Sequence, residues 1–328
     1  MKIRRPGLAL LVLFLLWVGV LAVAPLVGSQ PVSLLDALRG EPTASAIFFQ
    51  LRLPRVLLAL LAGAGLAVSG LAFQTLFRNE LAEPYTLGIA TGAALGAVLA
   101  LRLEESGLLM GMPLVSLASF AGAIGATALV VGLAWRRRGS TATLLLAGIA
   151  VSLSCSALIL FLQYLSDSTQ TFRMVRWMMG GLSVVGYGEV LWTAPWVLGG
   201  AAVLLALRWD LNLLLLGEEL AASRGVDLVR LRLKVLGVAS LMIGALVAVA
   251  GPIGFVGLMV PHMIRRWVGH DHLFLAPACL LGGGAFLAAC DVAARTVMAP
   301  AELPVGVLTA LLGGPFFLWL LVIGRKER

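Results

Sequence analysis

The chain repeats one pattern along its length: an apolar stretch of about 20 residues, followed by a short polar or charged connection. A helix of about 20 apolar residues spans the hydrocarbon core of a bilayer. The charge content agrees, because Asp, Glu, Lys and Arg make up 12% of the 328 residues, whereas soluble domains carry about 25%. The sequence therefore predicts one all-α, polytopic membrane domain over residues 1–328.

About ten transmembrane helices with short connections are expected. Nine of them have the approximate ranges 8–27, 56–76, 86–101, 113–135, 140–165, 189–207, 235–250, 274–296 and 305–323. The remaining one, the eighth in order, is a short span that follows the Gly- and Pro-rich segment 251–257 and ends at Arg266. The basic start and Ala22-Val23-Ala24 are also compatible with a secretory signal, but the first apolar run is longer than a signal core. We therefore expect an uncleaved first helix.

The connections supply two further expectations. Residues 28–55 are predicted to form a polar to amphipathic outer segment, and residues 166–188 to hold a short helix on the membrane surface. Small residues in the second span, including Gly63 and Gly70, favour close approach of a neighbouring helix.

The basic residues predict how the chain is oriented. The net charge of +8 is compatible with nucleic-acid binding, but in a membrane protein Lys and Arg concentrate on the cytoplasmic side. With ten spans, seventeen of the 24 basic residues fall on that side, Arg136–Arg138 among them. The seven predicted to lie outside are Arg39, Arg52, Arg55, Arg102, Arg173, Arg176 and Arg295. Both termini are therefore predicted to be cytoplasmic, and no nucleic-acid partner is expected.

The longest charged interruption, residues 208–234, is predicted to be cytoplasmic. Gly217-Glu218-Glu219 places acidic residues in a first helical turn, and Gly225 stands where a glycine commonly ends a helix. Asp227 then suits the N-cap of a second short helix that ends near Arg232. Two short helices joined at a glycine are expected, although a solvated loop with ordinary caps is the simpler alternative.

Sequence motifs limit the chemistry of the chain. It lacks the Gly-x-x-x-x-Gly-Lys-[Ser/Thr] phosphate-binding loop, so nucleotide hydrolysis by the common route is not expected. No series of mid-membrane carboxylates suggests an ion-coupled carrier, and Asp291 is the deepest acidic candidate. No pair of residues at a reactive spacing indicates an enzyme.

Metal binding is not expected either. His270-Asp271-His272 contains two ligand types, but a closed site requires further ligands, so a polar interfacial loop is the preferred interpretation. Cys155, Cys279 and Cys290 lie inside apolar stretches and are expected to be buried small side chains.

Several stretches together resemble the FecCD family, the permease subunits of type II ABC importers for iron chelates, haem and vitamin B12. The matching segments are Arg52-Leu-Pro-Arg55, Asn79-Glu-Leu-Ala-Glu-Pro84, Leu144-Leu-Leu-Ala-Gly148, Trp177-Met-Met-Gly-Gly181, residues 217–225, Gly251-Pro-Ile-Gly-Phe-Val-Gly-Leu-Met-Val-Pro-His262, Ala301-Glu-Leu-Pro-Val-Gly306 and Gly313-Gly-Pro315. They follow one another over nearly the whole chain.

The resemblance implies a multi-pass homodimer in the bacterial inner membrane, with two ATP-binding subunits below it and a substrate-binding protein outside. The chain itself would need no cofactor, because ATP and Mg would bind the ATPase subunits. The expected cargo is a bulky metal chelate, an iron-siderophore or haem, with vitamin B12 as the alternative within the family. An ion-coupled secondary transporter is the alternative of another class.

The resemblance also implies roles for particular residues. Contact with the ATPase is expected at 217–232, through Gly217, Glu218, Glu219, Ala221, Arg224, Gly225, Val226 and Asp227. Docking of the binding protein is expected at Arg52, Arg55 and Arg295, since arginine pairs well with a partner's carboxylates. The cytoplasmic gate resembles Asn79, Leu81, Thr141 and Ala142. The chain departs from the family's pattern at Glu80, where proline is common, and this leaves the stiffness and charge of the gate open.

Overall fold

The computed structural model describes residues 6–28, 33–105, 112–135 and 141–323. Within these ranges every regular element is helical. Three groups of basic residues used for the topology prediction, in segments 1–5, 136–140 and 324–328, lie outside the described residues.

The predicted spans correspond to helices of the structure. They are α1 (Pro6–Val23), α4 (Leu53–Leu76), α5 (Ile89–Glu105), α6 (Met112–Trp135), α7 (Thr141–Tyr164), α9 (Gly188–Ala206), α12 (Leu228–Ala250), α13 (Val256–Val268), α14 (His272–Thr296) and α15 (Val305–Ile323). In the described part of the chain seven helical segments are long and apolar enough to cross a membrane. The apolar parts of α5 and α15 are shorter. The all-α, polytopic fold class is confirmed.

Helix α4 lies at the centre of the bundle. It packs against α14, α13, α9 and α12, and side chains such as Leu58, Leu71 and Phe73 are fully buried. Its helical run begins well before the predicted start, because α3 (Pro42–Ser45) and a π-helical segment (Ala46–Arg52) lead into α4 without a break. Proline is favourable at a first helical position, which explains the start at Pro42. Part of the predicted outer segment 28–55 is therefore helix.

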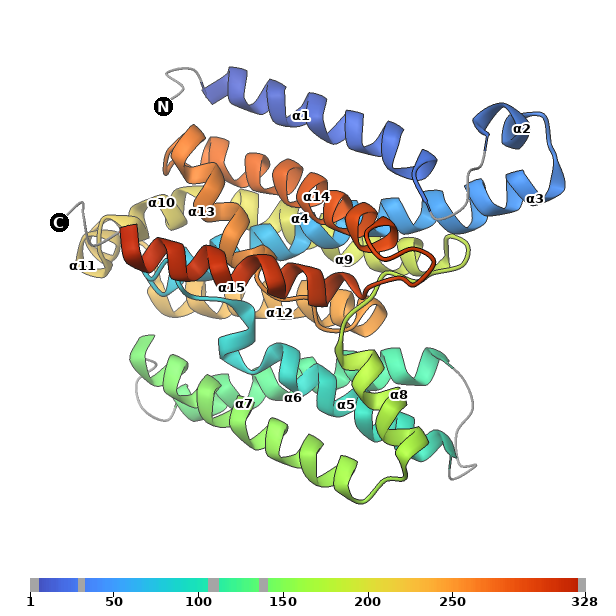
Figure 1. Cartoon of the computed structure of the whole chain (residues 1–328). Helices are drawn as coiled ribbons and strands as arrows, with labels where there is room; N and C mark the ends of the chain where they lie inside the picture. The colour runs from blue at the N-terminus through green and yellow to red at the C-terminus, as the bar shows by residue number, and fades with distance from the viewer. Residues whose placement is uncertain (1–5, 29–32, 106–111, 136–140, 324–328) are drawn as a thin grey trace.

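Helices α5, α6 and α7 form a second layer beside the α4 layer (Figure 1). Within it α5 packs against α6 and α7, and α6 connects the layer to the centre through α12. The surface helix predicted in 166–188 is α8 (Ser168–Met178), which begins at Asp167 and contacts α5 and α7.

Close backbone contacts at glycines hold α4 against two neighbours. A Cβ atom on Gly63 would overlap the backbone of Gly283 in α14, and one on Gly70 would overlap the backbone of Gly257 in α13. The predicted close approach at these small residues is confirmed. Backbone contact replaces side-chain contact at these two crossings.

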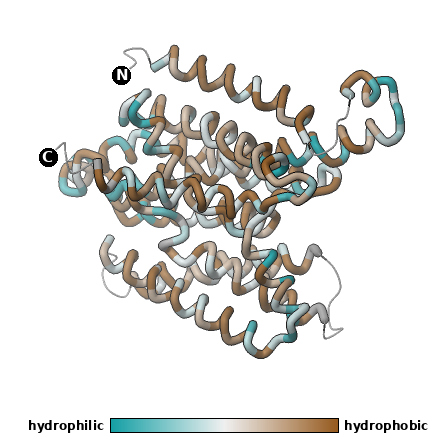
Figure 2. The backbone as a smooth tube through the Cα atoms, viewed as in Figure 1, coloured by the Kyte–Doolittle hydropathy of each residue, from teal (hydrophilic) through white to brown (hydrophobic). Residues whose placement is uncertain are grey.

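Polar residues gather at the two ends of the bundle, and apolar residues cover the middle (Figure 2). One end carries α10 (Arg208–Leu215) and α11 (Glu218–Ser223), together with the start of α1 and the end of α15 (Figure 1). The other end carries α2 (Leu34–Leu38), α3 and α8. An apolar zone between two polar ends is the arrangement that a bilayer requires.

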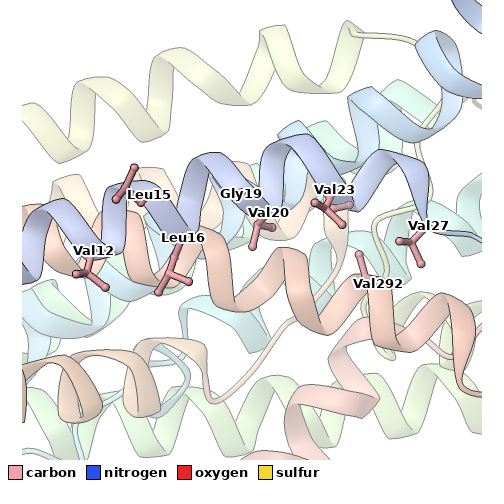
Figure 3. Close-up of a pocket in the computed structure, with 9 residues that line it drawn as sticks. Val12, Leu15, Leu16, Gly19, Val20, Val23, Val27 and Val292 are labelled. Carbon is pink, nitrogen blue, oxygen red and sulfur yellow. The ribbon is translucent and has the colours of Figure 1, made fainter. Parts of the chain in front are cut away.

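Helix α1 lies at the edge of the bundle, along α14. An apolar groove of about 550 Å³ runs beside it, lined by residues of α1, the turn that follows it, and Val292 of α14 (Figure 3). Its lining side chains are aliphatic, so it suits contact with lipid chains. Cys155, Cys279 and Cys290 are buried and unbonded, as expected.

Candidate coupling and gating site

Helix α11 is a six-residue helix with well-formed ends. Glu218 and Glu219 occupy its first turn, after Gly217 at a φ of +129°. At its other end Gly225 has a φ of +88°; its N–H donates to Ala222 O, and the N–H of Val226 donates to Ala221 O. This pair of bonds is the Schellman motif, which satisfies the last carbonyl groups of a helix. The predicted glycine at the end of the first short helix is confirmed.

The second predicted short helix is not a separate element. Asp227 is the expected N-cap, since its side chain accepts hydrogen bonds from the N–H groups of Val229 and Arg230. The helix that it starts, α12, continues to Ala250. No glycine or proline interrupts the sequence until Gly237, and buried Leu231 and Val235 lie one turn apart. The prediction of two short helices is therefore wrong: the structure has one short helix and the first turns of a long one.

The predicted coupling residues differ in exposure. Ala221 is fully buried and holds α11 against the bundle. Glu219, Arg224, Gly225 and Asp227 are exposed, whereas Gly217, Glu218 and Val226 are partly buried. Leu216, Leu220 and Val229 add large exposed apolar side chains around the same helix. Exposed apolar groups among charged residues are typical of a protein-binding surface.

A triad of side chains joins this segment to a predicted gate residue. Arg232 Nη2 lies 2.7 Å from Glu218 Oε1 and donates a hydrogen bond of 3.1 Å to Thr141 Oγ1. Thr141 Oγ1 in turn lies 3.1 Å from Glu218 Oε1, to which it donates. The triad connects α11, α12 and the first residue of α7.

The electrostatics of Glu218 favour its charged form. Partial burial raises its pKa, but the hydrogen bond and positive charge of Arg232, the Thr141 hydroxyl and the charge of Arg78 together hold the pKa below its ordinary value. Arg78 directly precedes the other predicted gate residues. The ion pair with Arg232 is thus present at neutral pH.

The remaining predicted gate residues lie in the turn after α4 and at the start of α7. We call residues 78–83 the gate loop. Asn79 Oδ1 accepts a hydrogen bond of 2.9 Å from the N–H of Leu81, which fixes a tight turn. Asn79, Leu81 and Ala142 are exposed.

A cavity of about 860 Å³ opens beside the gate loop. Its lining includes Glu83, Tyr85, Gln163, Met178 and Phe255. Glu83 Oε1 accepts a hydrogen bond of 2.6 Å from the N–H of Phe255, at the start of α13. Burial raises the pKa of Glu83 to about 7, although this hydrogen bond lowers it. The cavity therefore contains a carboxyl group that titrates near neutral pH.

The predicted docking arginines lie at the opposite end and bond within the chain. Arg55 pairs with Asp291 at 3.0 Å and with Glu302 at 2.7 Å, and Arg295 pairs with Asp291 at 3.1 Å. Arg52 donates to the carbonyl groups of Pro25 and Leu26.

These arginines are largely covered. Arg52 and Arg295 are 7% and 3% exposed, and Asp291 is fully buried. The side chain of Glu302 is 42% exposed. The three arginines with Asp291 and Glu302, here called the arginine cluster, thus join helix ends within the chain. Docking of a binding protein at these arginines stays a prediction.

Sequence reasoning missed α10 and its contacts. Asn212 Oδ1 accepts from the N–H of His272 at 3.0 Å and lies 2.7 Å from His272 Nδ1. His272 Nε2 lies 2.9 Å from Thr75 Oγ1 of α4. These contacts tie the helix before α11 to both α14 and α4. The sequence signal for α10 was the spacing of Leu211 and Leu214, which places them one turn apart on a helix. Both are buried in the structure.

Comparisons with known proteins agree with this architecture. Residues 9–323 match the model of the FecCD transport family. The chain is 43% identical over 287 residues to the hemin transport system permease protein HmuU of Yersinia pestis, covering 86% of this chain and 85% of that one. It is 41% identical over 305 residues to the vitamin B12 import system permease protein BtuC of Shigella boydii, covering 91% and 90%.

A solved structure has the same fold. It is described as an inward-facing conformation of a metal-chelate type ABC transporter, and it aligns with a TM-score of 0.88 at 34% sequence identity. The alignment covers 97% of this chain and 99% of that one. The family match over nearly all residues, the two relatives and the shared fold lead to one conclusion: the chain belongs to the FecCD transport family.

Proposed function

We propose that the chain is the permease subunit of an ATP-driven importer that moves a bulky metal chelate across the bacterial inner membrane. The triad of Glu218, Arg232 and Thr141 is the observation that carries this proposal, because it joins an exposed helix to the start of α7. Energy has to be delivered from outside the chain, since the sequence has no phosphate-binding loop.

The partners follow from the same features. Two chains form a homodimer, and each presents α11 with exposed Leu220, Glu219 and Arg224 to an ATPase subunit that binds ATP and Mg. A substrate-binding protein docks at the opposite end, where its carboxylate would replace Glu302 at Arg55. Both termini and α11 face the cytoplasm in this proposal, which is supported by the position of the start of α1, the end of α15 and α11 at one end of the bundle (Figure 1).

Two relatives supply the cargo classes. One is named for hemin and the other for vitamin B12, so an iron chelate of the haem or siderophore type is the first candidate and a corrinoid the second. The cavity of about 860 Å³ beside the gate loop supports an organic cargo rather than a bare ion, because pockets of this size enclose drug-sized ligands.

Reconstitution tests the proposal. Liposomes that contain the chain, the ATPase and the binding protein should accumulate haem or cobalamin only when ATP is present. Omitting the ATPase should abolish uptake. Uptake by the chain alone in response to a pH gradient would instead establish a secondary transporter.

A further inference from the structure

The gate loop contacts α13 through an acidic side chain. Glu80 Oε1 lies 3.3 Å from Arg265 Nη1, and Glu80 Oε2 lies 3.5 Å from His262 Nδ1. Both basic side chains belong to α13, which runs from Val256 to Val268. The loop begins at Arg78, whose φ of +48° is unusual for a residue with a side chain. The turn is therefore conformationally strained at its start and ionically tethered two residues later.

The α13 side of this contact is fixed by other bonds. Arg265 Nη2 donates to Gln74 Oε1 at 2.8 Å, and Gln74 Nε2 donates to the carbonyl groups of Gly257 and Leu258. The last turn of α4 is thereby attached to α13, and the His262 ring lies against Phe316 of α15. Glu80 thus pairs with side chains that other contacts hold in place on α13.

The proton of His262 is placed by its surroundings. Its Nε2 is buried and has no hydrogen-bond partner within the described chain, whereas Nδ1 faces the Glu80 carboxylate. An ionised carboxylate only accepts hydrogen bonds, so Nδ1 carries the proton. Within the described residues, Glu80 is the acidic group beside both His262 Nδ1 and Arg265 Nη1.

The carboxylate is charged at neutral pH. The hydrogen bond from His262 lowers the pKa of Glu80; partial burial opposes this, and the charges of Arg265, His262 and His270 lower it further, so the pKa lies below its ordinary value. These are the basic groups that act on Glu80 from α13 and from the connection after it. The contact is consequently an ionic one that salt should weaken.

We propose that Glu80 is a positioning residue, which clamps the gate loop onto α13 and so sets the positions of Asn79 and Leu81. The other end of the loop is held in parallel, since Glu83 bonds to the N–H of Phe255 at the start of α13. The significance for transport rests on the proposed function, whereas the clamp is a property of the chain itself. Gate loop and α13 then move together.

A spin label on the loop measures the clamp directly. Leu81 is 45% exposed, so Leu81→Cys accepts a nitroxide label, and the buried native cysteines are controlled by labelling the chain without this change. In the purified full-length chain, Glu80→Gln should raise the ratio of mobile to immobile label by about 1.4-fold to fivefold, the range for a partly exposed ionic contact. Glu41→Gln, the same change on an exposed residue before α3, should leave it unaltered.

Salt separates a clamp from a general packing effect. Raising NaCl from about 0.05 M to about 1 M should mobilise the label in the wild-type background and have little effect with Glu80→Gln. Equal mobility in both backgrounds, or an equal response of both to salt, would overturn the proposal. ATP-dependent uptake by the assembled transporter is measured separately: a freed loop with unchanged uptake would leave the clamp standing and refute the gate assignment.

Discussion

The Arg232 guanidinium occupies the junction between the exposed helix α11 and the start of α7. It bonds to Glu218 on one and to Thr141 on the other, and its side chain is 13% exposed. Hydrogen bonds between charged groups at partly buried positions are stronger than those at the surface. Replacement of Arg232 therefore tests whether this junction carries the proposed coupling between ATP hydrolysis and transport.

Replacing Arg232 should uncouple the two activities. Arg232→Met keeps an unbranched apolar stem but lacks the guanidinium that makes both bonds, so uptake should fall about tenfold, the effect of losing roughly 1.4 kcal/mol of coupling. ATP hydrolysis by the assembled complex should persist. Lys234→Met is the matched control, because Lys234 is exposed on the same helix outside residues 217–232. Equal losses of uptake in the two variants would argue against the triad.

Glu83 gives the chain a pH dependence of known sign. The pKa of Glu83 is about 7 in the folded chain, compared with 4.5 for an ordinary glutamate, as in the unfolded chain. Between these two pH values the folded chain therefore binds more protons than the unfolded chain. Stability from this group is fully present below pH 4.5 and is lost as pH rises through 7. The change amounts to about 3 kcal/mol.

The measurement is a melting temperature in detergent at pH 5 and pH 8. Glu83→Gln keeps an acceptor for the Phe255 N–H and removes the titration, so its melting temperature should fall less between the two pH values than that of the wild-type chain. Parallel behaviour of the two proteins would show that Glu83 does not titrate in this range.

At the scale of elements, α4 is positioned by glycines that let backbones touch. At Gly70 a Cβ atom would overlap the backbone of Gly257. Separation of α4 from α13 would also break the bonds from Gln74 to Gly257 and Leu258. The gate loop follows α4 directly, so this crossing also determines where the loop begins.

Gly70→Ala should destabilise the chain by about 1–3 kcal/mol through overpacking. Gly237→Ala is the control: Gly237 lies inside α12 with nothing within 4 Å of the added Cβ, and alanine is favoured over glycine in a helix by up to about 1 kcal/mol. Thermal melting in detergent should therefore move in opposite directions for the two variants. A stable Gly70→Ala protein would contradict the close crossing.

The sequence predicted elements where a pattern was local. Apolar runs of span length found the ten helices, and Gly225 and Asp227 were found by their capping chemistry. The predictions failed where a helix extends beyond its expected start or end. The sequence between Asp227 and Gly237 has no glycine or proline to end a helix, and α12 continues through it. Proline allows a helix to begin at Pro42, and the buried side chain of Phe48 packs the segment that follows.

The site was less predictable because its contacts are long-range in sequence. Thr141 and Glu218 were each expected to matter, but their meeting through Arg232 depends on how α7, α11 and α12 are placed. Likewise Arg55 was expected to pair with acids of another protein, and nothing in the sequence indicated that Asp291 and Glu302 would lie beside it.

At the scale of the whole molecule, the bundle has two polar ends with different chemistry. One end holds α10 and α11, and the other holds α2, α3 and α8 (Figure 1). Central α4 reaches from one end to the other, because it carries Arg55 near its start and leads into the gate loop at its end. A displacement of α4 thus affects both ends at once.

The central claim is that α11 receives motion from a nucleotide-hydrolysing partner, and site-directed cross-linking tests it most directly. Ala222 is exposed on α11, so Ala222→Cys carries a photoactivatable cross-linker in the assembled transporter. We predict reagent access from the cytoplasmic face and a cross-linked product between this chain and the ATPase subunit. Access only from the outer face, or assembled complexes whose α11 cross-links to no ATPase, would contradict the account.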